Sequence, residues 1–193
     1  MKIKDTETLM KTQFLNIKAT QYEDTKGDEK FWVWVQRTGG RRAVVIAAVV
    51  DKGMIEIQPK VYQRDLRLVV TKEFRVPMVD YEYGFPAGLI DGEEDPVDAA
   101  TRELKEETGL NVTRVLRKSP FIYNTAGMTD ESIAMVYVEC DGELSKEGLE
   151  ASEEIDTFLM TPAEVQTLLE DDTKKFGAKA WMVMSNFVRY NEI

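Results

Sequence analysis

Apolar residues recur along this chain in patterns that predict both strands and helices. Residues 43–50, AVVIAAVV, are too uniformly apolar for a half-exposed strand, so we expect a central strand covered on both faces. Residues 66–75, LRLVVTKEFR, are a second candidate of this kind. Aromatic and β-branched residues at 13–23 and 30–37 lie on either side of the polar, glycine-containing turn DTKGDE. These two segments predict a β hairpin.

The stretch around residues 95–109 predicts a helix with defined ends. Asp95 suits the N-cap, Pro96 suits the first helical position, and Gly109 suits the exit from the helix. The apolar stripe at helical spacing consists of Val97, Ala100 and Leu104.

The rest of the chain predicts further strands and two closing helices. Residues 76–88 have the Pro and Gly content of a loop, and residues 141–156 are acidic and favour a surface loop or edge. The remaining expected elements are strands at 112–118 and 131–140 that flank a loop at 123–131, a helix from 161 to about 170, and a last helix over about 176–190. Strands before and after one helix, followed by two helices, predict an α/β fold with a mixed sheet between helical layers.

Length and charge limit the organisation and the partners. With 193 residues and 43% hydrophobic content, the chain can form one sizeable domain or a main domain with a small appendage. A net charge of −10 disfavours nucleic acid and anionic membranes as partners. A single cysteine, Cys140, excludes an internal disulfide, and no run approaches the roughly twenty apolar residues of a membrane span. We therefore expect a cytoplasmic protein.

The chain contains no histidine. This excludes Ser-His-Asp and Cys-His catalysis, histidine bases and histidine metal sites. Carboxylates, lysine, tyrosine and metal-bound water remain for acid–base chemistry.

Three acids crowd one edge of the predicted helix. Glu103, Glu106 and Glu107 are spaced so that their like charges repel by a few tenths of a kcal/mol per pair. A solvated helix face is the simpler interpretation of such a cluster. A bound cation is the functional one, and glutamate oxygens favour hard ions such as Mg²⁺.

The wider spacing favours the functional interpretation. The pattern G-x5-E-x7-R-E-U-x-E-E-x-G-U, in which U is aliphatic, is matched throughout, and the chain resembles a Nudix hydrolase. The matching residues are Gly88, Glu94, Arg102, Glu103, Leu104, Glu106, Glu107, Gly109 and Leu110. The resemblance implies a Nudix-type α/β/α sandwich over residues 41–193, preceded by a small antiparallel β hairpin subdomain within residues 1–40.

The resemblance also implies a metal site. Glu103, Glu106, Glu107 and the carbonyl of Ala87 are the expected ligands of Mg²⁺, with Mn²⁺ as the alternative, and Glu106 is expected to be a shared or second ligand with a catalytic role. Gly88 lacks Cβ and so allows backbone to approach metal and phosphate closely.

Other residues of the box have an orienting role in the family. Glu94 and Arg102 are expected to orient the helix acids, and Gly109 ends the helix.

The general base is expected to be a carboxylate or a metal hydroxide. Glu131 resembles the loop glutamate that related ADP-sugar pyrophosphatases bring over the metals as a base or further ligand. A solvated loop acid is the alternative interpretation, and Asp130 is a neighbouring candidate.

The resemblance extends to the ADP-ribose/nucleoside diphosphate sugar pyrophosphatase branch through FPAGLID and the aromatic N-terminal hairpin. In that branch two aromatics clamp the base, often from different subunits of a homodimer, and Phe14 and Trp32 hold those positions. Ordinary packing is the alternative for both. Arg37 and Arg75 match arginines that contact substrate, and guanidinium forks suit phosphate and ribose oxygens. Leu89 is expected to line the same site.

The expected activity is Mg²⁺-dependent hydrolysis of the diphosphate bond of a nucleotide sugar such as ADP-ribose, giving a nucleoside monophosphate and a sugar phosphate. Val33 and Gly84 stand where the branch commonly has glutamate, so the base and sugar stay open and GDP-sugars are credible. Nucleoside triphosphates and capped RNA ends are the alternative substrates, and a noncatalytic nucleotide-sugar sensor is the alternative of another class.

Overall fold

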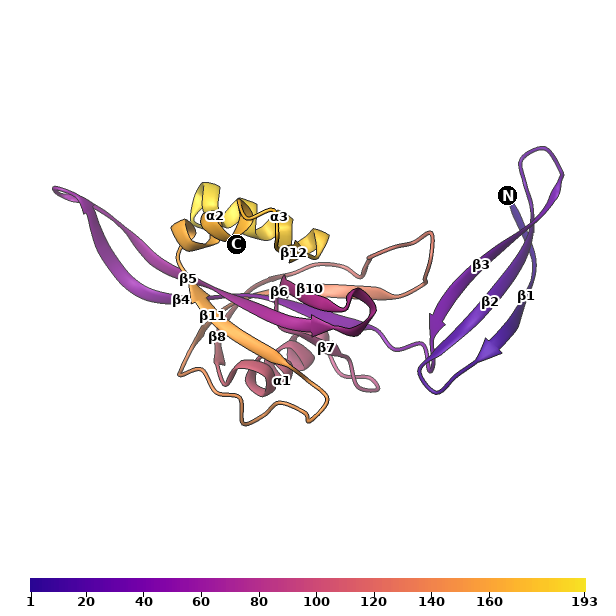
Figure 1. Cartoon of the computed structure of the whole chain (residues 1–193), viewed down its shortest axis with the longest axis horizontal. Coiled ribbons are helices and arrows are strands. Elements are labelled where there is room, and N and C mark those ends of the chain that lie inside the picture. Colours follow the sequence, from indigo (N-terminus) through magenta and orange to yellow (C-terminus); the bar gives the residue numbers. More distant parts are fainter.

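A computed structural model describes residues 1–193 as a large sheet between helices with a smaller sheet at the N-terminal end (Figure 1). The smaller sheet is antiparallel and contains β1 (Lys2–Lys11), β2 (Leu15–Glu23) and β3 (Glu29–Arg37). The large sheet contains β4 (Ala43–Gln58), β5 (Val61–Arg75), β6 (Asp80–Gly84), β7 (Ala87–Leu89), β8 (Asn111–Lys118), β9 (Ile122–Tyr123), β10 (Ser132–Asp141), β11 (Ile155–Met160) and β12 (Lys175–Phe176). The helices are α1 (Pro96–Thr108), α2 (Pro162–Leu169) and α3 (Ala178–Tyr190), with a short 3₁₀ turn at Val76–Met78.

The large sheet is mixed, as predicted. Its main path runs β12-β6-β5-β4-β10-β8, while β11, β7 and β9 pair with β5, β4 and β10. The β4–β10 and β6–β12 pairs are parallel, and the other pairs are antiparallel. Helix α1 lies on one face of this sheet, and α2 and α3 lie on the other (Figure 1). The predicted α/β/α sandwich is therefore confirmed.

Strand β4 shows why the run at 43–50 is uniformly apolar. Val44, Ile46 and Ala48 belong to the core beneath α1, whereas Val49 belongs to the core beneath α2 and α3. Successive residues of a strand point to opposite faces, so a strand covered on both sides needs apolar residues at every position.

The helix ends follow the local sequence. The Asp95 carboxylate accepts from the Val97 N–H at 2.8 Å, Pro96 begins α1, and Gly109 ends it with φ 79°. At α2, Thr161 and Glu164 form a reciprocal capping box. None of the helices is long and apolar enough to cross a membrane.

Several expectations were incomplete or wrong. The N-terminal hairpin is a three-stranded sheet, because β1 adds a strand whose residues are almost all exposed and carry no apolar alternation. Residues 76–88 are not simply a loop, since β6 pairs with β5 within them. Strands β4 and β5 also continue beyond the core as an exposed hairpin that projects from the sheet (Figure 1). The predicted division between residues 40 and 41 falls in the segment that joins β3 to β4.

Candidate functional site

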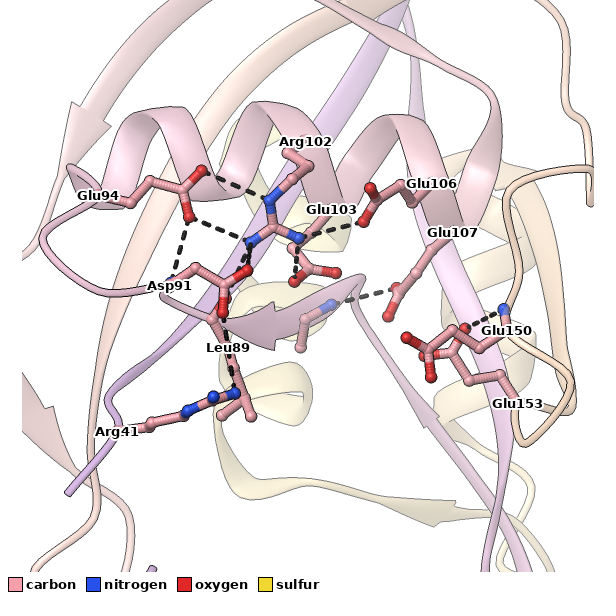
Figure 2. Close-up of polar contacts among 11 residues, drawn as sticks. Arg41, Leu89, Asp91, Glu94, Arg102, Glu103, Glu106, Glu107, Glu150 and Glu153 are labelled. Carbon is pink, nitrogen blue, oxygen red and sulfur yellow. Dashed lines mark hydrogen bonds and ion pairs between the residues drawn. The ribbon is translucent and has the colours of Figure 1, made fainter. Parts of the chain in front are cut away.

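Arg102 is the centre of the polar network around α1 (Figure 2). Its guanidinium donates to Glu94 at 3.1 Å, to Glu103 at 2.8 Å and to Glu106 at 3.1 Å. It also donates to the carbonyl oxygen of Leu89 at 3.0 Å. One half-buried arginine therefore ties the acids of the helix to the β7 segment below it, and these hydrogen bonds raise its own pKa.

Gly88 lies directly beneath Glu103. A Cβ built on Gly88 would lie 1.9 Å from the Glu103 Cδ, far inside van der Waals contact. The glycine is required here for close approach and not for an unusual backbone angle. Its absent side chain leaves the Glu103 carboxylate space to lie on the β7 backbone.

Glu107 is the most buried acid of the site, with 6% of its surface exposed. Burial raises its pKa to about 8, and the nearby Glu103, Glu153 and Glu73 carboxylates add to that rise. The Ala87 N–H donates to Glu107 at 3.2 Å and opposes the shift. Without a cation, this carboxylate is costly to ionise.

The acids of α1 face further glutamates across a cavity of about 480 Å³, the acidic cavity. Glu73 of β5 and two acids of the 142–154 loop, Glu150 and Glu153, also line this cavity. The loop packs closely on the helix at Gly148. A Cβ at this position would lie 2.5 Å from the carbonyl oxygen of Glu106. Burial also raises the pKa of Glu103 and of Glu73.

The donor set fits a divalent cation. Carboxylate and backbone oxygens are the ligands that Mg²⁺ prefers, and histidine and thiolate ligands are absent from the cavity. Burial raises the pKa of Glu107, Glu103 and Glu73, and a cation in the cavity would favour the charged forms of these carboxyls. No three acids of the structure converge as a ready-made metal site. Instead, a carboxylate oxygen of Glu103 and one of Glu106 accept hydrogen bonds from Arg102.

A second cavity of about 410 Å³, the mixed-charge cavity, adjoins the acidic one. The two share the β7 segment Ala87–Leu89 and Arg75. Arg75 donates to Glu73 at 2.5 Å on the acidic side and to Glu82 at 2.9 Å on the other. The mixed-charge cavity is also lined by Arg37, Asn124, Glu131 and Lys179. Three cationic side chains therefore line the cavity next to the acidic one, and Arg75 reaches both.

The structure brings some predicted residues together and separates others. Arg37, Arg75 and Leu89 line the mixed-charge cavity. Glu131 lies in that cavity and not among the acids of α1, because Arg37 holds it through ion-pair contacts of 2.7 and 2.8 Å. Asp130 instead accepts from Gln36 at 2.9 Å.

The predicted aromatic clamp is not assembled in the single chain. Phe14 is 68% exposed and lines neither cavity. The Trp32 indole N–H donates to the carbonyl oxygen of Gly127 at 2.9 Å. Its ring lines a third cavity of about 410 Å³, the aromatic cavity, together with Trp34 and Tyr123.

Residues missed by the sequence analysis include Glu73, Glu150, Glu153 and Lys179. The acidic content of residues 141–156 was a signal for Glu150 and Glu153, but the sequence analysis interpreted that segment only as a surface loop or edge. Lys179 carries no such signal, and burial at the start of α3 lowers its pKa.

An α/β/α fold in which an arginine links a row of helix glutamates to a glycine-containing strand defines the Nudix class of hydrolase. The NUDIX domain model matches residues 59–182. The chain therefore belongs to the Nudix family.

Similar proteins support this assignment. An uncharacterized Nudix hydrolase of Schizosaccharomyces pombe is 30% identical, over 82% of this chain and 75% of that protein. The ADP-ribose pyrophosphatase of Saccharomyces cerevisiae is 33% identical over 68% of this chain, and the ADP-sugar pyrophosphatase of Mus musculus is 30% identical over 71%. The matches cover 55% and 60% of those two proteins. They confirm the predicted family and branch.

A solved structure supports the fold. The crystal structure of an ADP compounds hydrolase has a TM-score of 0.67 and 22% identity, over 98% of this chain and 94% of that one. The family match and these relatives confirm the expectation of a Nudix enzyme that acts on pyrophosphate bonds.

Proposed function

We propose that the protein hydrolyses the diphosphate bond of ADP-ribose or a related nucleoside diphosphate sugar, with Mg²⁺, to a nucleoside monophosphate and a sugar phosphate. The observation that carries this proposal is the junction of the two cavities at Ala87–Leu89. One side offers carboxylates for cations and the other offers arginines for anions. A substrate that joins a metal-chelated diphosphate to polar groups needs both surfaces side by side.

The acids of α1 are the proposed ligands. Glu103, Glu106 and Glu107 hold the metal, together with the Ala87 carbonyl, and they fit because their carboxylates line one cavity in which Arg102 pairs with Glu103 and Glu106 but not with the buried Glu107. A bound Mg²⁺ polarises phosphoryl oxygens and lowers the pKa of water. Glu106 is the most exposed of the three and the one best able to turn toward a shared ion.

Arginines of the mixed-charge cavity bind and orient the substrate. Arg75 reaches both cavities, so its guanidinium is placed to contact phosphate oxygens at the junction. Arg37 of β3 and Leu89 of β7 line the same cavity. Their role is to hold the reacting phosphorus over the acids of α1.

Glu153 is the proton acceptor that the geometry favours. It lines the acidic cavity, and its charge raises the pKa of Glu103, Glu107 and Glu73. Glu131 is the second candidate, since it lines the mixed-charge cavity beside Arg37 and not the acidic cavity. A carboxylate close to the metal ligands is in reach of an attacking water.

The homodimer and the aromatic clamp belong to the same proposal. Phe14, Phe31 and Trp32 leave large apolar surfaces exposed on the N-terminal sheet of a single chain. Exposed aromatics of this size are typical of a surface that another chain covers. We propose that a second copy covers them and that Phe14 and Trp32 approach a nucleobase only in that dimer.

A hydrolysis panel tests the function. ADP-ribose, ADP-glucose, GDP-mannose, UDP-glucose, deoxynucleoside triphosphates and capped RNA are incubated with Mg²⁺ or with EDTA, and products are identified by mass. We expect a nucleotide sugar to yield a nucleoside monophosphate and a sugar phosphate with Mg²⁺ only. Faster hydrolysis of triphosphates or of capped RNA contradicts the proposal. Glu103→Gln and Glu107→Gln serve as controls that should lose activity while staying folded.

A further inference from the structure

The segment at residues 124–131 runs along strand β3 of the N-terminal sheet. The Val35 N–H donates to the carbonyl oxygen of Met128 at 2.8 Å, which extends the sheet edge by one parallel bridge. The Trp32 indole N–H donates to the carbonyl oxygen of Gly127 at 2.9 Å. The N-terminal sheet is thus joined to this segment by backbone and side-chain hydrogen bonds.

The contacts continue along β3 into the mixed-charge cavity. Gln36 donates its side-chain amide to Asp130 at 2.9 Å. The next residue, Arg37, pairs with Glu131. At the other end of the segment Lys179 of α3 donates to Asn124. Both ends of the segment therefore lie on the cavity wall, and its middle is held by β3.

We propose that Trp32 and Gln36 are positioning residues that hold segment 124–131 against β3. These hydrogen bonds hold the segment so that Asn124 and Glu131 face the substrate. They also place Arg37 opposite these two residues. The inference rests on the proposed function for its substrate. It gives Trp32 a role within one chain that differs from stacking on a nucleobase.

The chemistry of the contacts supports a positioning role. The Trp32 N–H is committed to a backbone carbonyl at hydrogen-bond distance, and the ring packs 4.0 Å from the position of a Cβ on Gly127. The Gln36–Asp130 contact is a single hydrogen bond between an amide and a carboxylate. Replacing the amide with a second carboxylate removes the donor and sets two like charges together.

A charge exchange at this contact tests the proposal without touching the acids of α1. Gln36→Glu should raise the KM for the best substrate of the panel about tenfold, with kcat changed less than about threefold. It should also accelerate hydrogen exchange of the Val35 amide. In the double variant Gln36→Glu/Asp130→Asn an amide again faces a carboxylate, so KM and exchange should return toward the wild-type values. An unchanged KM, or a double variant no better than the single one, overturns the proposal.

Trp32→Phe separates anchoring from stacking. Phenylalanine keeps an aromatic face and lacks the N–H, so anchoring predicts a raised KM and faster Val35 exchange. If Trp32→Phe matches wild type while Trp32→Ala loses affinity, stacking explains the residue and the proposal is wrong. Val35 exchange is measured without substrate. A protein that hydrolyses none of the panel therefore refutes the proposed function, while the exchange and its rescue still decide the anchoring.

Discussion

Replacing Glu107 with glutamine should stabilise the metal-free protein at alkaline pH while abolishing its activity. Burial raises the pKa of Glu107 from 4.5 to about 8. Between these values the folded protein holds a proton that the unfolded chain releases, so stability falls as pH rises through this window. Glutamine keeps a hydrogen-bond acceptor for the Ala87 N–H and carries no charge.

The pKa shift sets the size of this effect. At about 1.4 kcal/mol per pKa unit, ionising Glu107 in the folded state costs at most about 5 kcal/mol. Water entry and side-chain movement reduce that cost, and we expect Glu107→Gln to gain about 2 to 4 kcal/mol at pH 8.5. For a chain of this size the gain corresponds to roughly 5 to 15 °C in Tm. At pH 5.5 the folded carboxyl is neutral, but the unfolded chain has already released its proton, so at most about 1.4 kcal/mol of that gain should remain.

Thermal unfolding in EDTA at the two pH values measures the difference. Glu106→Gln is the matched control, since Glu106 is exposed and paired with Arg102, and it should show no such pH-dependent gap. Added Mg²⁺ should narrow the gap at pH 8.5 by stabilising only the wild type. An equal Tm difference at pH 5.5 and 8.5 would refute the claim that Glu107 is a buried carboxylate without a compensating charge.

Three further predictions follow from individual positions. Gly88→Ala should lower kcat at least tenfold with a Tm near wild type, because the atoms nearest to the new Cβ belong to the carboxylate at the end of the Glu103 side chain; a fully active variant would contradict this. Glu153→Gln should lower kcat by a factor of about 10² or more, whereas Glu131→Gln should mainly raise KM. The reverse result in steady-state kinetics would assign the base to Glu131. The Cys140 thiol, whose pKa burial raises to about 12, should resist a thiol reagent in the native protein and react after denaturation.

Regular elements were predictable where one local signal controls them. The α1 helix begins at Pro96 and ends before Gly109 because both ends carry strong capping residues. The β4 strand was recognisable over 43–50 because burial on both faces leaves a continuous apolar run. Strand β1 was missed because an exposed strand in a small sheet needs no apolar alternation.

Local spacing predicted the candidate site on the helix side, and the family resemblance named Arg37, Arg75 and Leu89 of the mixed-charge cavity. Spacing in one segment determines which residues share a helix edge, so Arg102, Glu103 and Glu107 could be named from the sequence. The opposite side depends on how a loop folds over the helix, and local spacing does not encode that arrangement. Glu153 was therefore not named from the sequence, whereas Glu131, which a long-range ion pair holds in the other cavity, was; the assignment of the base to either residue stays a prediction.

The central claim is that the acids of α1 hold divalent cations where the two cavities meet. Crystals grown with Mn²⁺ and a nonhydrolysable ADP-ribose analogue test it most directly, because the anomalous signal locates the metal. We predict anomalous peaks in contact with Glu103 and Glu107, with the analogue's diphosphate bridging from them to Arg75. Peaks elsewhere, or Glu103 and Glu107 free of metal beside a bound analogue, would contradict the account.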